Sequence, residues 1–514
     1  MSDILILAGL FLLCFIQRFM IAWKNPTAFD SYGHLYFAVC VNEQKVGPFG
    51  SIHPAVVGGD TFNHPFLFHW FVGLLGREWL LASQKIINPV LDSIFLVFAA
   101  FVLLRNGVVQ SDVINCGLLY VFTPLWFSKI SVGPRIGGFT PRLLSEVCIS
   151  LLILIWFYPA FDSGAANILL QIFLVVITLL SSKFGVQVVV ILVFGGLLLI
   201  GPVSSIPILV LSFLVSAIVS KGQLLENLRS QFDHLKWYFR ATNRGQIFAA
   251  NRNQFSRLFV WELKGSFRQN IGRLILNWLA RNSYTSTVIK APILLIFLYI
   301  ALTEHRSSLV DAQTHWPAWA IVIFVLINRP LFLFLGEAER YINHCAYLLV
   351  LCVALRFPEV EGTTYLKVLV IYGALFWLAE IYFINFKGLH RLEDETASDR
   401  CISILKAEDE DKVVASFPYH FVAPYRVMLE TNHEVFFPII SGQQAQKNQD
   451  RYESVYPYLD LERLNELYSD CGVNTVVISL KELRLRYPDW RIPSGWGVQL
   501  FEVEDMVILQ RPSE

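Results

Sequence analysis

The chain has 514 residues, of which 55% are hydrophobic and only 16% are charged. A soluble globular protein carries about 25% charged residues, so this composition indicates an integral, multi-pass membrane protein. The 41 basic and 41 acidic residues cancel, and the net charge therefore gives no support to a nucleic-acid-binding protein.

Residues 4–23 form the first apolar stretch, and a membrane span needs about 20 such residues. No basic residue precedes this stretch, and no small-residue cleavage site follows it. We therefore interpret it as a retained first span rather than a cleaved signal peptide.

The loop that follows, residues 24–80, carries polar side chains directly after the first span. It contains Asp30 and His34, which share one face if this run is helical, because residues four apart are neighbours on a helix. A carboxylate at the membrane surface is a natural general base for a substrate anchored in lipid. The alternative is a solvated aspartate that caps a helix.

Two further polar residues, Asp60 and His64, lie later in the same loop. They would line the mouth of any site that contains Asp30. Pro65 suits the first turn of a helix, and residues 65–75 are apolar but too few to cross a bilayer. We expect these residues to form an interfacial helix.

Further apolar runs bring the expected number of membrane spans to about eleven. The runs are residues 81–104, 113–127, 142–158, 167–181, 184–200, 203–220, 291–303, 318–335, 341–355 and 366–386. An odd number of spans places the C-terminal region on the same side of the membrane as Asp30. Residues 1–386 are thus predicted to form a polytopic α-helical transmembrane domain.

A basic insert occupies residues 221–290, with twelve Lys or Arg against three acidic residues. Aromatic side chains alternate with these charges, a composition that can bind nucleic acid. In a multi-pass chain it favours amphipathic helices that lie on anionic lipid. We expect membrane lipids, and no nucleic acid, as partners of this segment.

The pattern changes after residue 386. Short runs of β-forming residues at 412–417, 473–479 and 506–510 alternate with a helical stretch at 459–470. Strands that alternate with helices predict a small soluble α/β domain over residues 387–514.

Cationic side chains lie near the ends of several expected spans. Arg135 lies in a loop, residues 129–142, that contains no acidic residue, and Arg142 and Lys183 stand at the starts of spans. Glu146 lies one helical turn beyond Arg142 and could hold it in place. Charged groups at membrane depth are functional candidates, and the alternative is snorkelling at the end of a span.

Glu337, Arg340 and Tyr341 follow the ninth expected span. Spacings of three and four residues let these side chains share a helix face. The planar guanidinium of an arginine matches the oxygens of a phosphate. The alternative is an ion pair between Glu337 and Arg340 within the helix.

Taken together, these motifs resemble those of the C-type glycosyltransferases (GT-C), which include protein O-mannosyltransferases, aminoarabinose transferases and oligosaccharyltransferases. The shared features are the first-loop acid Asp30, His64-Pro65-Phe66-Leu67, Thr123-Pro124-Leu125, Ser182-Lys183-Phe184-Gly185 and Glu337-x-x-Arg340-Tyr341. Ser31 stands where many relatives have a second acid, and Phe66 where the family pattern has a second proline.

The resemblance implies a polyprenyl-phosphate-linked sugar as donor and transfer with inversion at the anomeric carbon. It implies Asp30 as the catalytic base. The other candidates would bind substrate, with the cations around the departing phosphate: His34, Asp60, His64, Arg135, Arg142, Glu146, Lys183, Glu337, Arg340 and Tyr341. In the family that these motifs resemble, relatives that use a metal ion carry an acidic motif in the second loop. Residues 129–142 contain no acid, so the resemblance implies chemistry without a metal ion or other cofactor.

The expected acceptor is a lipid-linked glycan or glycolipid of the cell envelope. The active site and the C-terminal domain would lie outside the cytoplasm, in a bacterial inner or plasma membrane. The positive-inside rule opposes this orientation, because the basic loops then lie outside. A protein acceptor is the alternative among enzymes, and a non-catalytic transporter or flippase of lipid-linked sugars is the alternative from another class.

Overall fold

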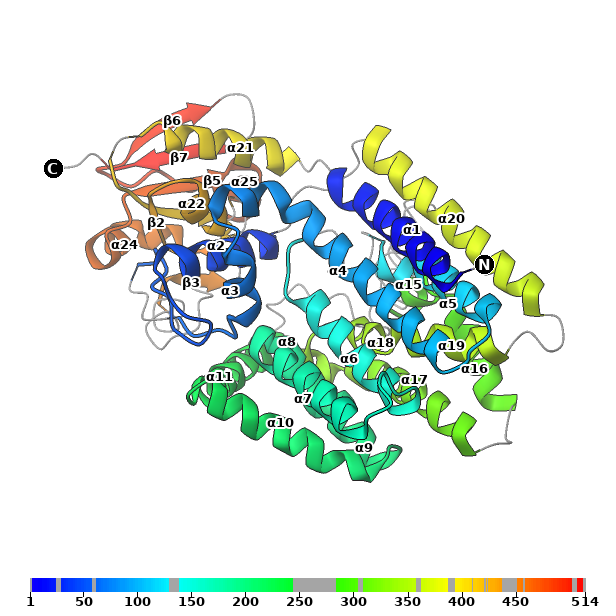
Figure 1. Ribbon diagram of the computed structural model, residues 1–514. Coiled ribbons are helices and arrows are strands. Elements are labelled where there is room, and N and C mark those ends of the chain that lie inside the picture. The colour runs from blue at the N-terminus through cyan, green and yellow to red at the C-terminus, as the bar shows by residue number, and fades with distance from the viewer. Residues whose placement is uncertain are drawn as a thin grey trace. The chain divides into compact units, whose positions relative to one another are not determined.

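The structure, a computed structural model, divides the chain into two compact units (Figure 1). We call them the helical unit, Met1–Asn25, Ser83–Leu225 and Trp237–Lys387, and the mixed unit, Pro26–Ala82, Glu226–Lys236 and Gly388–Glu514. The structure describes residues 2–24, 29–57, 62–128, 138–243, 283–303, 308–356, 362–386, 393–408, 410–419, 422, 424–436, 451–455, 458–501 and 506–511.

Long apolar helices make up the helical unit. Within the described residues, four are long and apolar enough to cross a membrane: Asp3–Trp23 in α1, Arg77–Arg105 (α4), Gly164–Ser181 (α7) and Thr364–Tyr382 in α20. Two bent pairs, Val203–Val219 with Gln223–Asp233 and Ser283–Lys290 with Ile293–Thr303, raise the number to six if each pair is one span. The expected long apolar helices are therefore present among the described residues, and the number of eleven spans is not confirmed.

Several expected spans are shorter or interrupted helices. The expected span 113–127 is α5, Gln110–Phe122, followed by the 3₁₀ turn η1, Pro124–Trp126. Proline has no N–H to continue an α-helix, so α5 ends before Pro124. The expected span 184–200 consists of α8, Lys183–Val188, the π-helical turn η2, Val189–Phe194, and α9, Gly195–Leu199.

The remaining elements of this unit complete a helical bundle, in which α7 and α10 run side by side (Figure 1). They are α6 Arg142–Phe157, η3 Val203–Ser205, α10 Ile206–Val219, α15 Ser283–Lys290, α16 Ile293–Thr303, α17 Ser308–Ile327, η4 Pro330–Leu335, α18 Glu339–Asn343, α19 Ala346–Arg356, and the full helices α1 Asp3–Lys24 and α20 Gly362–Phe386. Of the basic insert, α11, Gln223–Asn243, and α15 are described, and residues 244–282 lie outside the described part.

A buried ion pair joins α1, α4 and α5. The Nε of Arg18 donates to Asp92 Oδ2 at 2.8 Å, and both side chains are 0% exposed. The hydroxyl of Tyr120 donates to Asp92 Oδ1 at 2.6 Å. Arg18 also donates to the carbonyl oxygens of Val121, at 2.9 Å, and Tyr120, at 3.3 Å, near the end of α5. One arginine therefore neutralises a buried carboxylate and satisfies backbone groups that a helix end leaves without partners.

The mixed unit contains a five-stranded sheet with the order β2-β1-β5-β7-β6. β1 pairs in parallel with β2 and β5, whereas β7 is antiparallel to β5 and β6. All five residues of the central strand β5 are buried, as expected where both faces of a sheet are covered. The elements are β1 Val413–Phe417, β2 Glu434–Val435, β5 Thr475–Ser479, β6 Gly497–Phe501 and β7 Met506–Gln510, with β3 Glu453–Val455 and β4 Tyr458–Leu459 in a separate pair.

Helices accompany this sheet, including one that the sequence predicted at 459–470. They are α21 Glu393–Lys406, α22 Pro424–Glu430, η6 Leu461–Arg463, α24 Leu464–Cys471 and α25 Leu480–Arg486. Gly472 follows α24 with φ +69°, the left-handed conformation that commonly ends a helix.

The first loop belongs to the same unit as the C-terminal sheet. Helix α2, Phe29–Glu43, packs against α3, Leu67–Gly73, and against α22. The segment after α2 forms a parallel bridge between Val56 and Val435 of β2, with Val435 N donating to Ala55 O at 3.0 Å. The division at residue 386 expected from the sequence thus differs from the observed grouping, in which residues 26–82 join the C-terminal region.

Replacement of Asp92 by Asn should lower the free energy of unfolding by about 3–5 kcal/mol, because Arg18 would remain charged and buried without its carboxylate. Thermal unfolding of the detergent-solubilised protein measures this loss. Asp162→Asn is the matched control, because Asp162 pairs with Arg105 but its side chain is 96% exposed, and it should cost less than about 1 kcal/mol. Equal effects of the two substitutions would contradict the structural role of Arg18 and Asp92.

Candidate functional site

The charged residues that follow η4, Glu337 and Arg340, come after a sharp turn of the chain. Gly336 has φ +95°, a conformation open to glycine because it has no Cβ. Directly after this turn, the Nε of Arg340 donates to Glu337 Oε2 at 2.5 Å. The ion pair given as the alternative in the sequence analysis is therefore present, although Glu337 precedes α18, so the two residues do not share a helix face.

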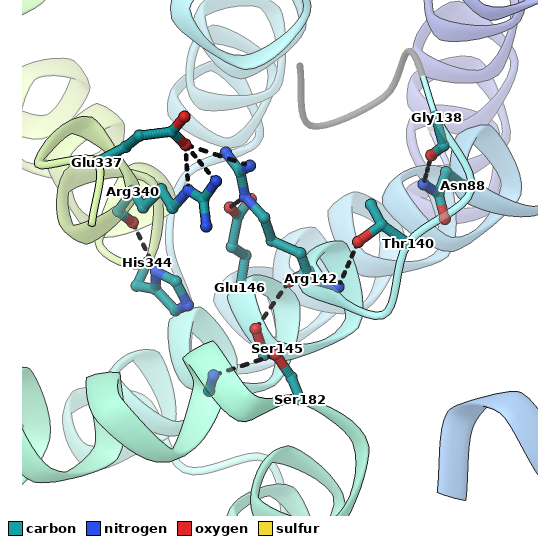
Figure 2. A network of polar contacts seen from close by, with 11 residues as sticks. Asn88, Gly138, Thr140, Arg142, Ser145, Glu146, Ser182, Glu337, Arg340 and His344 are labelled. Atoms are coloured by element: carbon teal, nitrogen blue, oxygen red, sulfur yellow. Dashed lines mark hydrogen bonds and ion pairs between the residues drawn. The ribbon is translucent and has the colours of Figure 1, made fainter. Parts of the chain in front are cut away.

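A second arginine approaches the same carboxylate from another helix (Figure 2). Arg142 begins α6, and its Nε donates to Glu146 Oε1 at 3.1 Å. Its Nη1 lies 3.9 Å from Glu337 Oε2. Figure 2 shows the Glu337 carboxylate between the guanidinium groups of Arg142 and Arg340. Two arginines and two glutamates from distant parts of the chain thus form one network.

The four side chains of this network differ in exposure, and this difference indicates different roles. Glu146 is 0% exposed and Arg142 11%, whereas Glu337 is 21% and Arg340 22% exposed. A buried carboxylate needs its cation, because an uncompensated buried charge is costly. The Glu337–Arg340 pair is partly solvated, so an incoming anion can compete with Glu337 for Arg340. A carboxylate that bridges two guanidinium groups occupies a position that suits a phosphate oxygen.

Aromatic and amide side chains support the arginine network. The guanidinium of Arg340 lies over the ring of Phe184, 5.1 Å from its centroid, a cation–π contact. The Nε2 of Gln187 donates to the hydroxyl of Tyr341 at 2.9 Å. Ser182 caps α8, in which Lys183 is the first residue, by accepting from Gly185 N at 3.1 Å.

Sequence reasoning missed several of these supporting residues. His344 lies one turn beyond Arg340, and its Nδ1 is 2.6 Å from the Arg340 carbonyl oxygen (Figure 2). The spacing of four residues between Arg340 and His344 could have indicated this contact. No sequence pattern could have indicated the contacts of Phe184 and Gln187, because their partners lie more than 150 positions away.

In the mixed unit, α2 carries the predicted base and its neighbouring histidine. Asp30 lies in the first turn of α2 and is exposed, and His34 is half-buried one turn later. His34 Nδ1 is 3.0 Å from Nε2 of His69, a fully buried residue of α3. The ring of His64 lies 6.1 Å from that of His34 and 5.3 Å from that of His69, between centroids. The helical form of residues 29–43 puts Asp30 and His34 on one face, as predicted.

Burial keeps both paired histidines neutral. It lowers the pKa of His34 to about 4. Burial, and then the charge of His34, lower the pKa of His69 well below its ordinary value, against the opposing effect of the Pro65 carbonyl. Around pH 7 each imidazole is therefore uncharged, with one N–H and one lone pair.

The predicted site residues fall into three sets. Arg142, Glu146, Glu337 and Arg340 come together. Tyr341 follows Arg340 in α18, and Lys183 begins α8 of the same helical unit. Asp30, His34 and His64 belong to the mixed unit. Asp60 and Arg135 lie outside the described residues. The juxtaposition of Asp30 with the cations remains a prediction.

Among the residues that the structure describes, no group of three or more His, Cys, Asp or Glu side chains is placed to hold a metal ion. The expectation of metal-independent chemistry remains a prediction.

The fold has counterparts among solved structures. No protein-family model matches the sequence, and no curated protein matches it. Among solved structures, ArnT from Cupriavidus metallidurans is similar over 99% of this chain and 97% of its own in the apo state, with TM-score 0.58 and 12% identity. The same enzyme bound to undecaprenyl phosphate has TM-score 0.56 and 12% identity, over 99% of this chain and 98% of its own.

An archaeal structure has the same fold. The apo oligosaccharyltransferase of Archaeoglobus fulgidus matches 93% of this chain and 70% of its own, with TM-score 0.52 and 12% identity. A sequence identity of 12% establishes a shared fold and nothing more. The resemblance to GT-C enzymes predicted from the sequence motifs is confirmed at that level.

Arg142→Met should lower the free energy of unfolding by about 3–5 kcal/mol, because the fully buried Glu146 loses its arginine. Arg340→Met, which removes a partly exposed pair, should cost about 1 kcal/mol or less. Chemical or thermal unfolding of the purified variants measures the difference. A larger loss of unfolding free energy in Arg340→Met than in Arg142→Met would contradict the roles assigned from exposure.

The protein should become less stable as the pH falls from about 6.5 towards 4. His34 and His69 are neutral when folded but take up protons below about pH 6.5 when unfolded. Their contribution to the free energy of unfolding is therefore complete above pH 6.5 and is lost as the pH falls below that value. Unfolding temperatures at pH 7.5 and pH 5 should differ less in a His34→Gln/His69→Gln double variant than in the wild type. An unchanged difference would show that these histidines do not titrate in this way.

Proposed function

We propose that this protein is a GT-C-type glycosyltransferase. It transfers a sugar from a polyprenyl-phosphate-linked donor to an extracytoplasmic acceptor, a lipid-linked glycan or glycolipid. The observation that carries the proposal is the network of Arg142, Glu337 and Arg340 in a chain with the fold of ArnT, a protein whose structure holds undecaprenyl phosphate.

The reaction breaks the bond between the anomeric carbon of the sugar and the phosphate oxygen. An acceptor hydroxyl attacks the anomeric carbon from the opposite side, and its proton passes to Asp30. The electron pair of the broken bond leaves with the lipid phosphate, which gains negative charge. The anomeric centre is inverted, and no atom beyond donor, acceptor and enzyme is needed.

The departing phosphate needs cations that are held in place before the reaction. Arg340 is the main candidate, because its partner Glu337 is accessible and can be replaced by a phosphate oxygen. Arg142 is locked to Glu146 and presents its Nη1 towards the same position. Lys183 and Arg135 would add further positive charge. Electrostatic stabilisation by fixed groups is commonly the largest contribution to this kind of catalysis.

Asp30 suits the role of general base in exposure and position. It is exposed in the first turn of α2, within the loop where the family resemblance expects the acid. His34, Asp60 and His64 would surround the acceptor, and Glu146 and Tyr341 would support the donor site. The C-terminal sheet would lie outside the cytoplasm with Asp30, and the basic insert would lie on membrane lipid.

Asp30→Asn should lower turnover by about 100-fold or more, because general-base assistance contributes about that factor. Binding of the donor should persist, because the phosphate contacts are unchanged. Glu43→Gln is the matched control, since Glu43 is an exposed acid at the far end of the same helix; it should retain turnover.

Mass spectrometry of the lipid that co-purifies with the Asp30→Asn variant identifies the trapped donor. A polyprenyl phosphate that carries a sugar is the expected lipid. Full transfer activity in Asp30→Asn would contradict the catalytic role of Asp30. Unimpaired movement of lipid-linked sugar across the membrane without transfer would favour a transporter. Sugar attached to protein rather than to lipid would favour the protein-glycosylating alternative.

A further inference from the structure

The carboxylate of Glu337 occupies the position in the arginine network that suits a phosphate (Figure 2). Its Oε2 accepts from Nε of Arg340 at 2.5 Å and also contacts Nη2 of the same guanidinium. Nη1 of Arg142 lies 3.9 Å from the same oxygen. Glu337 therefore uses the N–H groups that a phosphate oxygen would use, and the two anions compete for Arg340.

The second carboxylate of the network has a different setting. Glu146 is 0% exposed and accepts from Nε of Arg142, on the same helix, at 3.1 Å. Glu337 is 21% exposed and follows Gly336, which turns the chain with φ +95° before α18. A partly solvated carboxylate can leave its arginine at small cost, whereas a buried one cannot. An incoming phosphate therefore displaces Glu337 and leaves Glu146 in place.

A displaced Glu337 carboxylate stays close to the site. The residue lies in the short segment between η4 and α18, and its side chain reaches only a few bonds from that backbone. Its negative charge then lies beside the bound phosphate, in partly buried surroundings where charges interact more strongly than in water. An anion bound to Arg340 is therefore repelled by Glu337, and this repulsion increases with the charge of the anion.

Donor and product of the proposed reaction differ in charge at this phosphate. In the sugar-linked donor the phosphate is a diester with a single negative charge. The released polyprenyl phosphate is a monoester, which carries about two negative charges near pH 7. Two arginines alone would hold this product more tightly than the donor. Repulsion from Glu337 acts about twice as strongly on the product as on the donor, and so opposes that preference.

We propose that Glu337 discriminates between the two lipids: it yields Arg340 to the sugar-linked donor and displaces the polyprenyl phosphate after transfer. In this role Glu337 competes with the substrate instead of binding it. Arg142 remains fixed by Glu146 throughout. This inference rests on the proposed function and assigns to its donor site a residue that promotes release of the product.

Two lipids that differ only in phosphate charge test this role. Undecaprenyl phosphate is a monoester like the product, and its methyl ester is a diester with the charge of the donor. Titration of the detergent-solubilised protein with each lipid, followed by native mass spectrometry, gives both dissociation constants. Glu337→Gln should tighten binding of the monoester about tenfold and of the methyl ester about threefold. An equal gain for both lipids, or no gain, would overturn the proposal.

Three further variants separate charge from structure. Glu337→Asp keeps the negative charge and should retain the wild-type ratio of the two constants. Arg340→Met should weaken binding of both lipids, because the guanidinium is lost. Asp162→Asn, an exposed acid of the same unit that pairs with Arg105, is the matched control and should change neither constant. Weaker binding of both lipids in Glu337→Gln would show that Glu337 only holds Arg340 in place, and would overturn the proposal.

Transfer assays test the consequence for product release. Added undecaprenyl phosphate should inhibit Glu337→Gln about tenfold more strongly than the wild type, while KM for the donor falls only about threefold. If the wild type binds undecaprenyl phosphate and Glu337→Gln leaves the ratio of the two lipids unchanged, only the role of Glu337 fails. If the wild type binds no undecaprenyl phosphate, the proposed function fails, and the role of Glu337 fails with it.

Discussion

The close packing of α2 on α22 is the constraint on which the candidate catalytic residues depend. Gly33 lies against the ring of Tyr425, where a Cβ would be only 3.1 Å from the ring carbons. Arg426 covers the ring of Tyr32, 5.5 Å from its centroid. These contacts hold one side of α2 on α22 within the mixed unit. The orientation of Asp30 and His34 on the remaining surface is therefore set by a folded sheet and its helices, not by a free loop.

Charges in the helical unit serve two purposes, and exposure distinguishes them. The Arg18–Asp92 pair is wholly buried and satisfied by Tyr120 and by backbone carbonyls, so it ties helices together and has no access to a ligand. The Arg142–Glu337–Arg340 network runs from a buried end at Glu146 to a partly exposed end at Arg340. This difference in exposure holds Arg142 rigidly and leaves Arg340 able to exchange Glu337 for another anion.

The histidine pair joins α2 and α3 within the mixed unit. His69 is enclosed by three phenylalanine rings, where a charged imidazole would be costly. The 3.0 Å contact between His69 Nε2 and His34 Nδ1 joins this buried residue of α3 to a half-buried residue of α2.

The sequence alone determined what depends on composition and near-neighbour spacing. It predicted the apolar helices, the helical run at Asp30 and His34, the pairs Arg142–Glu146 and Glu337–Arg340, and the strands at 412–417, 473–479 and 506–510. It could not predict that residues 26–82 group with residues 388–514 in one unit. Nor could it predict that Glu337 also contacts Arg142, that His34 contacts His69, or that Arg18 contacts Asp92. Those contacts join residues 35 to 195 positions apart. No periodic pattern in the sequence indicates contacts over such separations. Only the packing of whole helices brings these residues together.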